Sequence, residues 1–470
     1  MKRLLKNIFS VIVLVVCALT IYEILKLDVL PNKYLIPLLV GEGVLFLLGL
    51  LLYNLKNKFL IVLGILLYLI SIAGNIFGYY YLSKTNQYIE KTFAVETYKV
   101  TTHYYLITGS SNPINELSEL DSSQGIQYNK NSISIDLAMK KLGNYDYHEL
   151  GYGSYTFYTF TTVSKENGYF LLPKDEFDFL IGSSNELTSD LFKIIYEFDV
   201  VEEFELNTNI SDSFNVYITG YDYSGKHRDY NLIASVNLKT HKIVLTSIPR
   251  DFYINIPAYE AKDSLTALGV VSSEIPKEAL EELFGIKIDY TVDVYTNSLV
   301  QVVDTLGGVE FCSDYDFETR HDTTLGSYAD KGERVYVSKG CKEYNGLEIL
   351  AIARERVRVY GGERTRQANC RKILVSIFKK LSSKSSVLNY ANILDSFEGL
   401  YTTNVNKHMI KELAKEFINN PNFEIIEQQV DGKDGSARNH WNTGTIYTLD
   451  PDMNTVNAAS KKINEVLNEK

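Results

Sequence analysis

Three long apolar runs lie within the first 82 of the 470 residues, and no other feature constrains the fold of this chain as strongly. The runs cover residues 8–25, 35–55 and 59 to about 82. Each is close to the roughly 20 residues that a helix needs to cross a bilayer. The first run is followed by two more, and no small-residue cleavage site marks it as a signal peptide. The sequence therefore predicts three transmembrane helices within residues 1–85.

Basic residues flank these runs unevenly. They are Lys2, Arg3 and Lys6 before the first run, and Lys56 and Lys58 between the second and third. Cytoplasmic loops are enriched in Lys and Arg, so both segments are expected in the cytoplasm. Two lysines in the first loop weaken this signal without reversing it. Because three spans place the chain ends on opposite sides, everything after residue 82 is predicted to lie outside the cytoplasmic membrane.

One carboxylate, Glu42, interrupts the second run. A charge within a bilayer is costly unless it is paired or lies near the interface. We expect Glu42 near the outer end of its helix, reaching toward the interface or packed between helices. A role in lipid handling is the less favoured alternative.

Net charge and cysteine content exclude several classes of function. The formal net charge is −11 and the isoelectric point is about 5.3, which disfavours a nucleic acid as partner. The four cysteines form no CxxC metal or redox motif. Cys312 and Cys341 could form a disulfide in an oxidising compartment, or both could be small buried thiols.

Residues 90–206 alternate strand-like and helix-like pieces, which predicts a small α/β domain. The strand-like pieces are 98–108 and 155–163, and the helix-like pieces are 133–142 and 189–198. The segment contains no cluster of His, Cys or nucleophilic residues. We therefore expect an accessory module.

A denser α/β pattern follows the polar boundary at 207–213. Strands are expected at 214–219, 232–237 and 242–248, and helices at 277–284, 299–306, 347–353 and 366–381. The last helix carries an apolar stripe, typical of a helix packed on a sheet, formed by Ile373, Leu374, Ile377, Phe378 and Leu381. Strands that alternate with helices predict a layered α/β domain.

Two carboxylates stand at facing strand ends in this domain. Asp222 follows the first strand and Asp229 opens the second. Carboxylate oxygens that converge in this way suit Mg²⁺ or Mn²⁺. Asp at a loop end is also a common turn residue, and the pair alone favours that simpler interpretation.

Arginines gather at the same predicted edge. Arg250 and Asp251 end the third strand, and Arg354, Arg356, Arg364 and Arg366 lie around the turn Tyr360-Gly361-Gly362. Arg354 and Arg356 are two residues apart and would diverge on a helix. The helix should therefore end near Ala353 and leave both guanidiniums on one side of an extended piece. Converging guanidiniums suit a pyrophosphate, although a solvated basic face is an equal alternative.

Taken in order, these motifs resemble the LytR-CpsA-Psr family over about residues 212–466. The motifs that carry the resemblance are the strand and GxD at 216–222, the loop 225–229 with Asn231, Ser247-Ile248-Pro249-Arg250-Asp251, Leu306-Gly307-Gly308-Val309, the segment Asn345-Gly346-Leu347 to Arg356, Gly362-Glu363-Arg364-Thr365-Arg366, and the closing strands at 432–456. Three spans and an accessory domain are similar to the capsule-associated members. Each motif is short, but their shared order is specific.

The resemblance implies an αβα layered domain with a mixed central sheet at 212–468. It also implies an extracellular phosphotransferase that moves a polyprenyl (undecaprenyl) pyrophosphate-linked glycopolymer, capsule or teichoic-acid-like, to peptidoglycan, with a possible pyrophosphatase activity. Asp222 and Asp229 would hold Mg²⁺ (or Mn²⁺), and these two with Arg250 would form the catalytic set. Arg250, Arg354, Arg356 and Arg366 would clamp the phosphates. A non-catalytic sensor of polyprenyl-linked precursors is the alternative.

Several positions depart from the family pattern. The chain has His227-Arg228-Asp229 where the family usually has Arg-Ser-Asp, so Arg228 is expected to supply the missing phosphate contact, or His227 when protonated. Ser264 and Ala267 stand where Lys and His are frequent, and Cys370 replaces a common Gln. These changes put rate and substrate in doubt more than fold.

Overall fold

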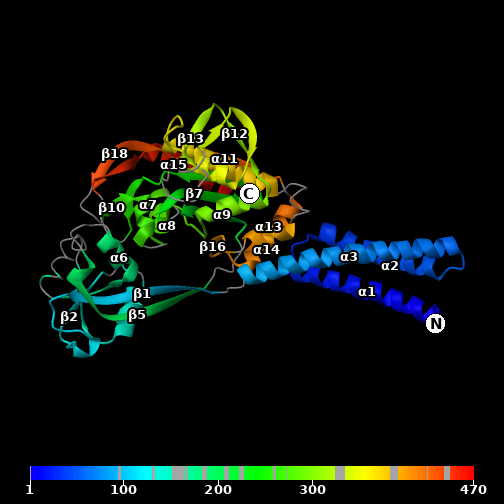
Figure 1. The fold of residues 1–470 in the computed structure, drawn as a ribbon, viewed down its shortest axis with the longest axis horizontal. Coiled ribbons are helices and arrows are strands. Elements are labelled where there is room, and N and C mark those ends of the chain that lie inside the picture. The colour runs from blue at the N-terminus through cyan, green and yellow to red at the C-terminus, as the bar shows by residue number, and fades with distance from the viewer. Residues whose placement is uncertain are drawn as a thin grey trace.

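Three long helices project from a larger α/β body in this computed structural model (Figure 1). It describes residues 2–93, 97–129, 132, 134–150, 163, 165, 168–182, 188–205, 211–221, 227–257, 261–271, 274–322, 334–381, 390–397, 399–420, 422–438 and 445–470. The projecting helices are α1 (Lys2–Leu27), α2 (Asn32–Asn54) and α3 (Lys58–Thr92). All three are long and apolar enough to cross a membrane, as the sequence predicted. Close approach of α2 and α3 needs a glycine, since a Cβ on Gly64 would lie 2.7 Å from the backbone nitrogen of Tyr53.

The three helices meet at a polar cluster around Glu42. Asn75 donates to both carboxylate oxygens of Glu42 at 3.2 Å, and Cys17 and Ser71 each donate to Oε2 at 3.5 Å. Glu42 is the eleventh of the 23 residues of α2, so it lies midway along the helix and not near one end. The expectation of a position near the outer end was wrong. Donors from both neighbouring helices satisfy the carboxylate there, so it does not need to reach the interface.

The accessory domain is a five-stranded sheet with strand order β3-β2-β4-β1-β5. Its elements are β1 (Thr97–Gly109), η1 (Leu117–Glu119), β2 (Gly125–Tyr128), α4 (Ile135–Leu142), β3 (Asp146–Glu149), β4 (Tyr169–Pro173), α6 (Lys174–Gly182), η2 (Ser189–Leu191) and β5 (Phe192–Glu205). The expected strand at 98–108 and helix at 133–142 correspond to β1 and α4. The expected strand at 155–163 lies outside the described residues, apart from Val163.

The helix expected at 189–198 was wrong, because most of this segment belongs to β5. Its buried residues Phe192, Ile195 and Phe198 are three apart, which imitates one face of a helix. The structure shows a β-bulge here: Leu106 pairs with Tyr196 but Ile107 pairs with Ile194, so Ile195 is an extra residue. A bulge breaks the two-residue alternation of a strand, and this explains the misleading spacing.

The second domain is built on a six-stranded mixed sheet with order β16-β11-β6-β7-β8-β17. These strands are β6 (Ser213–Tyr221), β7 (Arg228–Asn237), β8 (Lys242–Ile248), β11 (Tyr290–Val294), β16 (Tyr401–Thr403) and β17 (Glu424–Gln429). The pairs β11–β6 and β17–β8 are parallel, and the other three pairs are antiparallel. The predicted strands at 214–219, 232–237 and 242–248 are confirmed.

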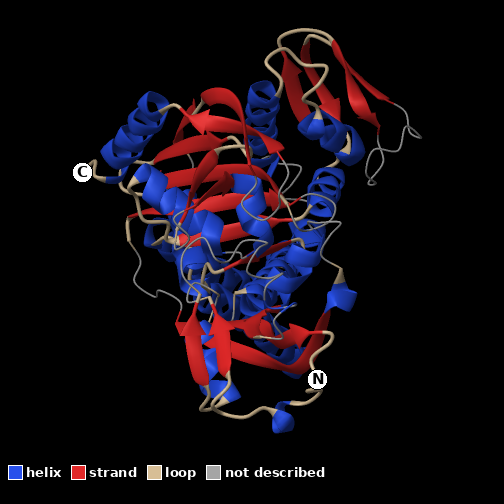
Figure 2. Ribbon diagram, turned by 90° about the vertical axis from the view of Figure 1, so that its left-hand side faces the viewer, coloured by secondary structure: helices blue, strands red, loops and turns tan. Residues whose placement is uncertain are grey.

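Helices cover both faces of this sheet and form the predicted αβα layers (Figure 2). One face packs against α7 (Leu265–Val271), α8 (Glu274–Phe284) and α15 (Met453–Leu467). The helices α9 (Thr296–Thr305), α10 (Gly346–Arg354) and α11 (Glu363–Leu381) lie on the other. The remaining elements are β9 (Tyr253–Ile256), β10 (Ala261–Ser264), β12 (Val309–Ser313), β13 (Phe317–Asp322), β14 (Arg334–Val337), β15 (Gly340–Tyr344), α13 (Tyr390–Phe397), α14 (Lys407–Asn419), β18 (Gly432–Arg438) and β19 (Thr445–Pro451).

The second domain, built on the six-stranded sheet and here called the sheet domain, packs directly on the end of the three-helix bundle. With 35 residues α3 is about 52 Å long, well beyond the roughly 30 Å of a bilayer core. Its last turns pack against α13 and α14. The hydroxyls of Tyr88 and Tyr401 are 2.8 Å apart, and Lys407 pairs with Glu90 at 3.2 Å. These contacts hold the domain close to the end of the bundle.

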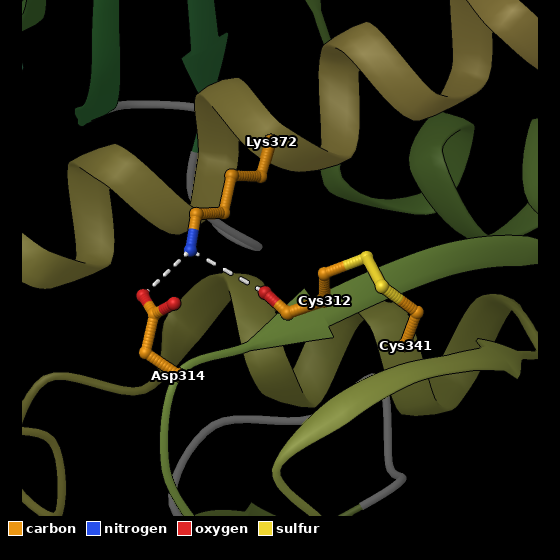
Figure 3. Close-up of a disulfide and its surroundings, with 4 residues drawn as sticks. All are labelled: Cys312, Asp314, Cys341 and Lys372. Atoms are coloured by element: carbon orange, nitrogen blue, oxygen red, sulfur yellow. Dashed lines mark hydrogen bonds and ion pairs between the residues drawn. A yellow bond between two sulfur atoms is a disulfide. The ribbon is translucent and has the colours of Figure 1, made fainter.

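Cys312 and Cys341 are joined by a disulfide (Figure 3). They lie directly opposite each other on the antiparallel strands β12 and β15. Lys372 of α11 donates to the backbone oxygen of Cys312 at 3.3 Å and to Asp314 at 3.2 Å. The disulfide therefore lies next to α11, in the layer that carries the arginines. The alternative that Cys312 and Cys341 are two small buried thiols was wrong.

Candidate active site

A cavity of about 490 Å³ lies between the sheet and the helices α9, α10 and α11. Its polar end is lined by His227, Asp229, Arg250, Arg354, Arg356 and Arg366. Its apolar walls are formed by Ile218, Val294, Leu299, Leu350, Ile373, Leu374 and Ile377. Five residues of α11 line it in succession: Arg366, Cys370, Ile373, Leu374 and Ile377. Eleven residues of helix span about 16 Å, so the cavity joins a charged end to a long apolar pocket.

The predicted apolar stripe of α11 is only partly a packing surface. Ile373 and Ile377 are buried, and with Leu374 they also face the cavity. Phe378, expected on the same stripe, is 50% exposed. The apolar side of α11 therefore forms part of the wall of the cavity.

Arg354 and Arg356 are brought to the cavity by the end of α10. The helix starts with a capping box in which Asn345 and Glu348 exchange hydrogen bonds, and it ends at Arg354 with Glu355 in an extended conformation. Glu355 is buried and accepts hydrogen bonds from the backbone nitrogens of Arg320, Val357 and Arg358. Because residues of an extended segment alternate in direction, Arg354 and Arg356 both face the cavity. The prediction of one shared side is confirmed.

Asp229 is held by two arginines. Arg250 Nη1 donates to Asp229 Oδ1 at 2.5 Å, and Arg366 Nη2 donates to the backbone oxygen of Asp229 at 2.5 Å. The Asp229 side chain is still 38% exposed. Arg366 is itself buried and also bonded to Glu363. The structure thus brings Asp229, Arg250, Arg354, Arg356 and Arg366 together at one end of the cavity.

The partly buried carboxylate Glu363 balances this cluster of cations. Burial raises the pKa of the Glu363 carboxyl, but attraction to Arg366 and Arg250 and hydrogen bonds from Arg366 and Gln367 outweigh burial and lower its pKa below the usual value. Glu363 therefore stays ionised and fixes the Arg366 guanidinium, while Arg250, Arg354 and Arg356 line the cavity wall.

Arg228 does not reach this cavity. It is 1% exposed and donates to the Tyr221 hydroxyl at 2.8 Å, with Asp293 at 3.9 Å. Its aliphatic part packs against Gly269, where a Cβ would lie 2.8 Å from Arg228 Cδ. Because neighbouring strand residues face opposite sides of a sheet, Asp229 points to the cavity and Arg228 to the opposite face. The position of Arg228 does not support its expected role in phosphate binding.

The other family departures are spread over two environments. Ser264, directly before α7, and Ala267, within α7, are buried and are not part of the cavity lining. His227 and Cys370 do line the cavity. Cys370 Sγ donates to the backbone oxygen of Ala353 at 3.4 Å, and burial raises the pKa of its thiol to about 11. Asp222, the second expected metal ligand, lies outside the described residues.

Sequence reasoning missed two glutamates that support the arginines, the buried Glu355 and the partly buried Glu363. Glu355 and Glu363 each stand next to or near an arginine in the segment 354–366. In Arg354-Glu355-Arg356 a carboxylate stands between two arginines. If both arginines face a ligand on an extended segment, the residue between them must point into the protein. This pattern could have identified Glu355. The apolar wall could not be recognised, because its residues come from five separate elements.

Comparison with known proteins identifies the domain that carries this cavity. The LytR_cpsA_psr family matches residues 184–465. The chain is 25% identical over 221 residues to the polyisoprenyl-teichoic acid–peptidoglycan teichoic acid transferase TagU of Enterococcus faecalis, covering 45% of this chain and 68% of that protein. It is 29% identical over 205 residues to TagU of Bacillus subtilis, covering 43% and 63%.

Two further proteins are similar over other shares of the chain. Biofilm regulatory protein A of Streptococcus mutans is 24% identical over 207 residues, covering 41% of this chain and half of that protein. The crystal structure of Bacillus subtilis TagV covers 56% of this chain and 100% of its own, with 22% identity and a TM-score of 0.46. Because the family match spans more than half of the chain and includes every described residue of the cavity, this protein belongs to the LytR-CpsA-Psr family.

Proposed function

We propose that this protein is an extracellular phosphotransferase that moves a polyprenyl pyrophosphate-linked glycopolymer, capsule or teichoic-acid-like, to peptidoglycan. The relatives named as teichoic acid–peptidoglycan transferases support glycopolymer transfer in general. The observation that carries the proposal is the cavity, which runs for about 16 Å along α11 and joins an arginine-rich end to an apolar pocket. A lipid pyrophosphate has the matching two-part chemistry.

The chain's own residues divide the work of holding such a substrate. The guanidiniums of Arg354 and Arg356 suit phosphate oxygens, because a planar fork of donors forms paired charge-assisted hydrogen bonds. Arg250 links Asp229 to the same wall and is placed to neutralise negative charge that develops on the leaving phosphate. The apolar walls exclude water from the isoprenoid chain, which gains from burial of its apolar surface.

The site also fits a divalent cation. Only Oδ1 of Asp229 is bonded to Arg250, and the carboxylate is partly exposed at the cavity, so it can offer an oxygen ligand. Mg²⁺ bound with substrate phosphates commonly uses only one or two carboxylates and retains waters. Asp229, with Asp222, which follows β6 in the sequence, would hold Mg²⁺ (or Mn²⁺), which supplies charge neutralisation at the phosphates.

We propose that the sheet domain lies on the outer side of the cytoplasmic membrane. The basic residues at the start of α1 and around the turn between α2 and α3 favour a cytoplasmic location for those segments. The Cys312–Cys341 disulfide agrees with this orientation, because disulfides persist in oxidising compartments.

Transfer can be tested with the full chain in detergent, a polyprenyl pyrophosphate-linked glycan and a peptidoglycan fragment. We expect Mg²⁺-dependent transfer that Asp229→Ala reduces by at least 100-fold while the protein stays folded. Arg354→Ala and Arg356→Ala should each weaken donor binding about tenfold or more, because each removes charge-assisted hydrogen bonds. Equal turnover with Mg²⁺, with a chelator and with Asp229→Ala would refute the enzymatic assignment.

A sensor of lipid-linked precursors is the second candidate. It is favoured by Cys370, which faces the cavity where a polar Gln is common in the family, and by the position of Arg228 away from the cavity. A sensor would bind the donor with the same dependence on Arg354 and Arg356 but would transfer nothing to the fragment.

A further inference from the structure

A second surface lies across Arg250 from the cavity. Arg250 Nε is 3.6 Å from Asp251 Oδ1, whereas Arg250 Nη1 holds Asp229 on the cavity side. Arg250 is part of the cavity lining, but Asp251 is not. The two carboxylates therefore flank one guanidinium, and only one of them faces the apolar pocket.

The β18–β19 hairpin forms the other side of this surface. Leu449 of β19 donates from its backbone to the oxygen of Asp251 at 2.8 Å, and Phe252 and Leu449 form a parallel β-bridge. Arg364 of α11 ties β18 to the site, because it donates to Asp431 at 2.6 Å and to the backbone oxygen of Gly432 at 3.1 Å. The hairpin is thus fixed beside the arginine-lined end of the cavity by the segment after β8, which carries Asp251 and Phe252, and by the helix α11, which carries Arg364 and Arg366.

An exposed aromatic ring stands on this hairpin. Tyr447 is 52% exposed, and its hydroxyl donates to Asp434 at 2.5 Å. It lies near enough to Asp251 and Arg364 for their charges to act on its hydroxyl. Its pKa is raised to about 12, by partial burial first and then by Asp434 and Asp251, so it remains neutral. A fixed ring with carboxylates and a guanidinium around it matches a sugar, which has both apolar faces and hydroxyl groups.

We infer that Asp251, Arg364 and Tyr447, here called the hairpin surface, bind the acceptor glycan, and that Asp251 is the general base for its attacking hydroxyl. This inference rests on the proposed transfer function. The donor occupies the cavity on one side of Arg250, and the acceptor approaches from the other. Such an arrangement is what displacement at phosphorus requires, because the attacking and leaving oxygens lie roughly in line.

The reaction step balances without an added co-reactant. The acceptor hydroxyl oxygen forms a bond to the phosphorus that carries the glycan. The anhydride bond from that phosphorus to the bridging oxygen breaks, and the electron pair leaves with polyprenyl phosphate. The hydroxyl proton passes to Asp251. Arg250 lies between the two carboxylates and can stabilise the leaving phosphate.

The surroundings of Asp251 suit a base. Its side chain is 15% exposed, so it is shielded but reachable. Burial raises the pKa of its carboxyl, and this effect outweighs its attraction to the neighbouring guanidiniums. The charged and titratable groups that act on it or lie beside it are Arg250, Arg356, Arg366, Glu363 and Tyr447. A carboxylate with a raised pKa accepts a proton more readily than an ordinary one.

The test uses the full chain, a polyprenyl pyrophosphate-linked glycan and a soluble peptidoglycan fragment, with donor affinity measured separately. Asp251→Asn should lower kcat by 10²- to 10⁴-fold and leave donor affinity within threefold. In the wild type kcat should fall as the pH drops through the Asp251 pKa, and Asp251→Asn should lack this fall. Asp251→Glu, which keeps a base, should recover part of kcat.

Variants of the ring test acceptor binding without disturbing the core. Tyr447→Ala should raise the KM for the acceptor at least tenfold, whereas Tyr447→Phe should stay within threefold of the wild type. Two matched controls are used. Asp212→Asn changes an exposed Asp directly before β6, at the end of that strand away from the cavity, and Tyr196→Ala changes an exposed ring on the accessory domain. Both controls should transfer at the wild-type rate.

The outcomes separate this inference from the function on which it rests. A wild-type protein that transfers nothing refutes both. If the wild type transfers normally, and Asp251→Asn keeps both the wild-type kcat and its fall at low pH, then Asp251 is not the general base. An unchanged acceptor KM in Tyr447→Ala, or an equal increase in Tyr447→Phe, refutes the hairpin surface as a stacking site. Loss of donor affinity in these variants would place the surface in the donor site instead.

Discussion

At the scale of single residues, strand alternation assigns neighbouring side chains to different tasks. Arg228 and Asp229 are adjacent, yet Asp229 faces the cavity and Arg228 is buried against Tyr221 and Asp293. Burial raises the pKa of the Asp293 carboxyl, and Arg228 offsets part of this effect. The pair therefore stabilises the opposite face of the sheet and is not part of the arginine cluster at the cavity.

Arg228→Met should accordingly destabilise the domain and spare donor binding. Removing one partner leaves the partly buried Asp293 without its cation, which costs up to about 3 kcal/mol. Thermal unfolding in detergent would report the loss, and the double variant Arg228→Met with Asp293→Asn should recover part of it. The interpretation fails if Arg228→Met keeps its stability but loses donor affinity.

A buried carboxyl in the accessory domain gives a second prediction at this scale. Glu176 is 3% exposed and accepts a hydrogen bond from Ser132 at 3.2 Å. Burial raises its pKa from 4.5 to about 8, and the Ser132 bond only partly opposes this shift. The folded state thus keeps a proton that the unfolded state has released, so stability should fall by a few kcal/mol as the pH rises from about 4.5 to about 8.

Glu176→Gln supplies the matched control, because it keeps the shape and removes the titration. Hydrogen exchange of the accessory domain, followed over the same pH range, should show the loss of protection in the wild type and a flat response in the variant. A wild type with a flat response would show that Glu176 does not hold its proton in the folded state.

At the scale of elements, the ends of helices and strands place the charges. The helix α10 stops at Arg354 because Glu355 turns inward to cap the next backbone nitrogens. The sequence predicted this end from the spacing of two arginines. It did not predict β5, since a bulge gave a strand the spacing of a helix. Local patterns are dependable where one period continues, and they mislead where a tertiary pairing inserts a residue.

The disulfide belongs to this scale because it joins β12 to β15 beneath α11. Closing a loop with a sequence separation of 29 residues should stabilise the fold by about 3.6 kcal/mol on the chain-entropy model. Cys312→Ser with Cys341→Ser should lower the midpoint of thermal unfolding, and reduction of the wild type should reproduce that shift. Free thiols at both positions in unreduced, unfolded protein would contradict the bond.

At the scale of the whole molecule, a long helix couples the membrane anchor to the catalytic domain. The end of α3 packs on α13, and α13 also packs on α9, whose Leu299 lines the cavity. The cavity is thus connected to the end of the bundle by packed helices. A lipid-linked substrate would have a short path from the membrane to this pocket.

The orientation of the whole chain is testable with fusions. A reporter that is active only in the cytoplasm should be silent after Lys470 and active when fused before Met1. The basic residues near α1 and between α2 and α3 are the reason, since such segments stay in the cytoplasm. Strong activity after Lys470 would overturn both the orientation and the proposed substrate.

The sequence by itself determined the three apolar helices, the layered α/β class and the family, because each depends on local hydrophobic patterns or on the order of short motifs. It also identified Asp229, Arg250, Arg354 and Arg356, which the structure brings to one cavity. Only the tertiary structure decided that Arg228 faces away, that Glu42 lies between three helices, and that an apolar pocket continues from the arginines. These features depend on which side chains from distant segments meet, and chain order alone does not specify such contacts.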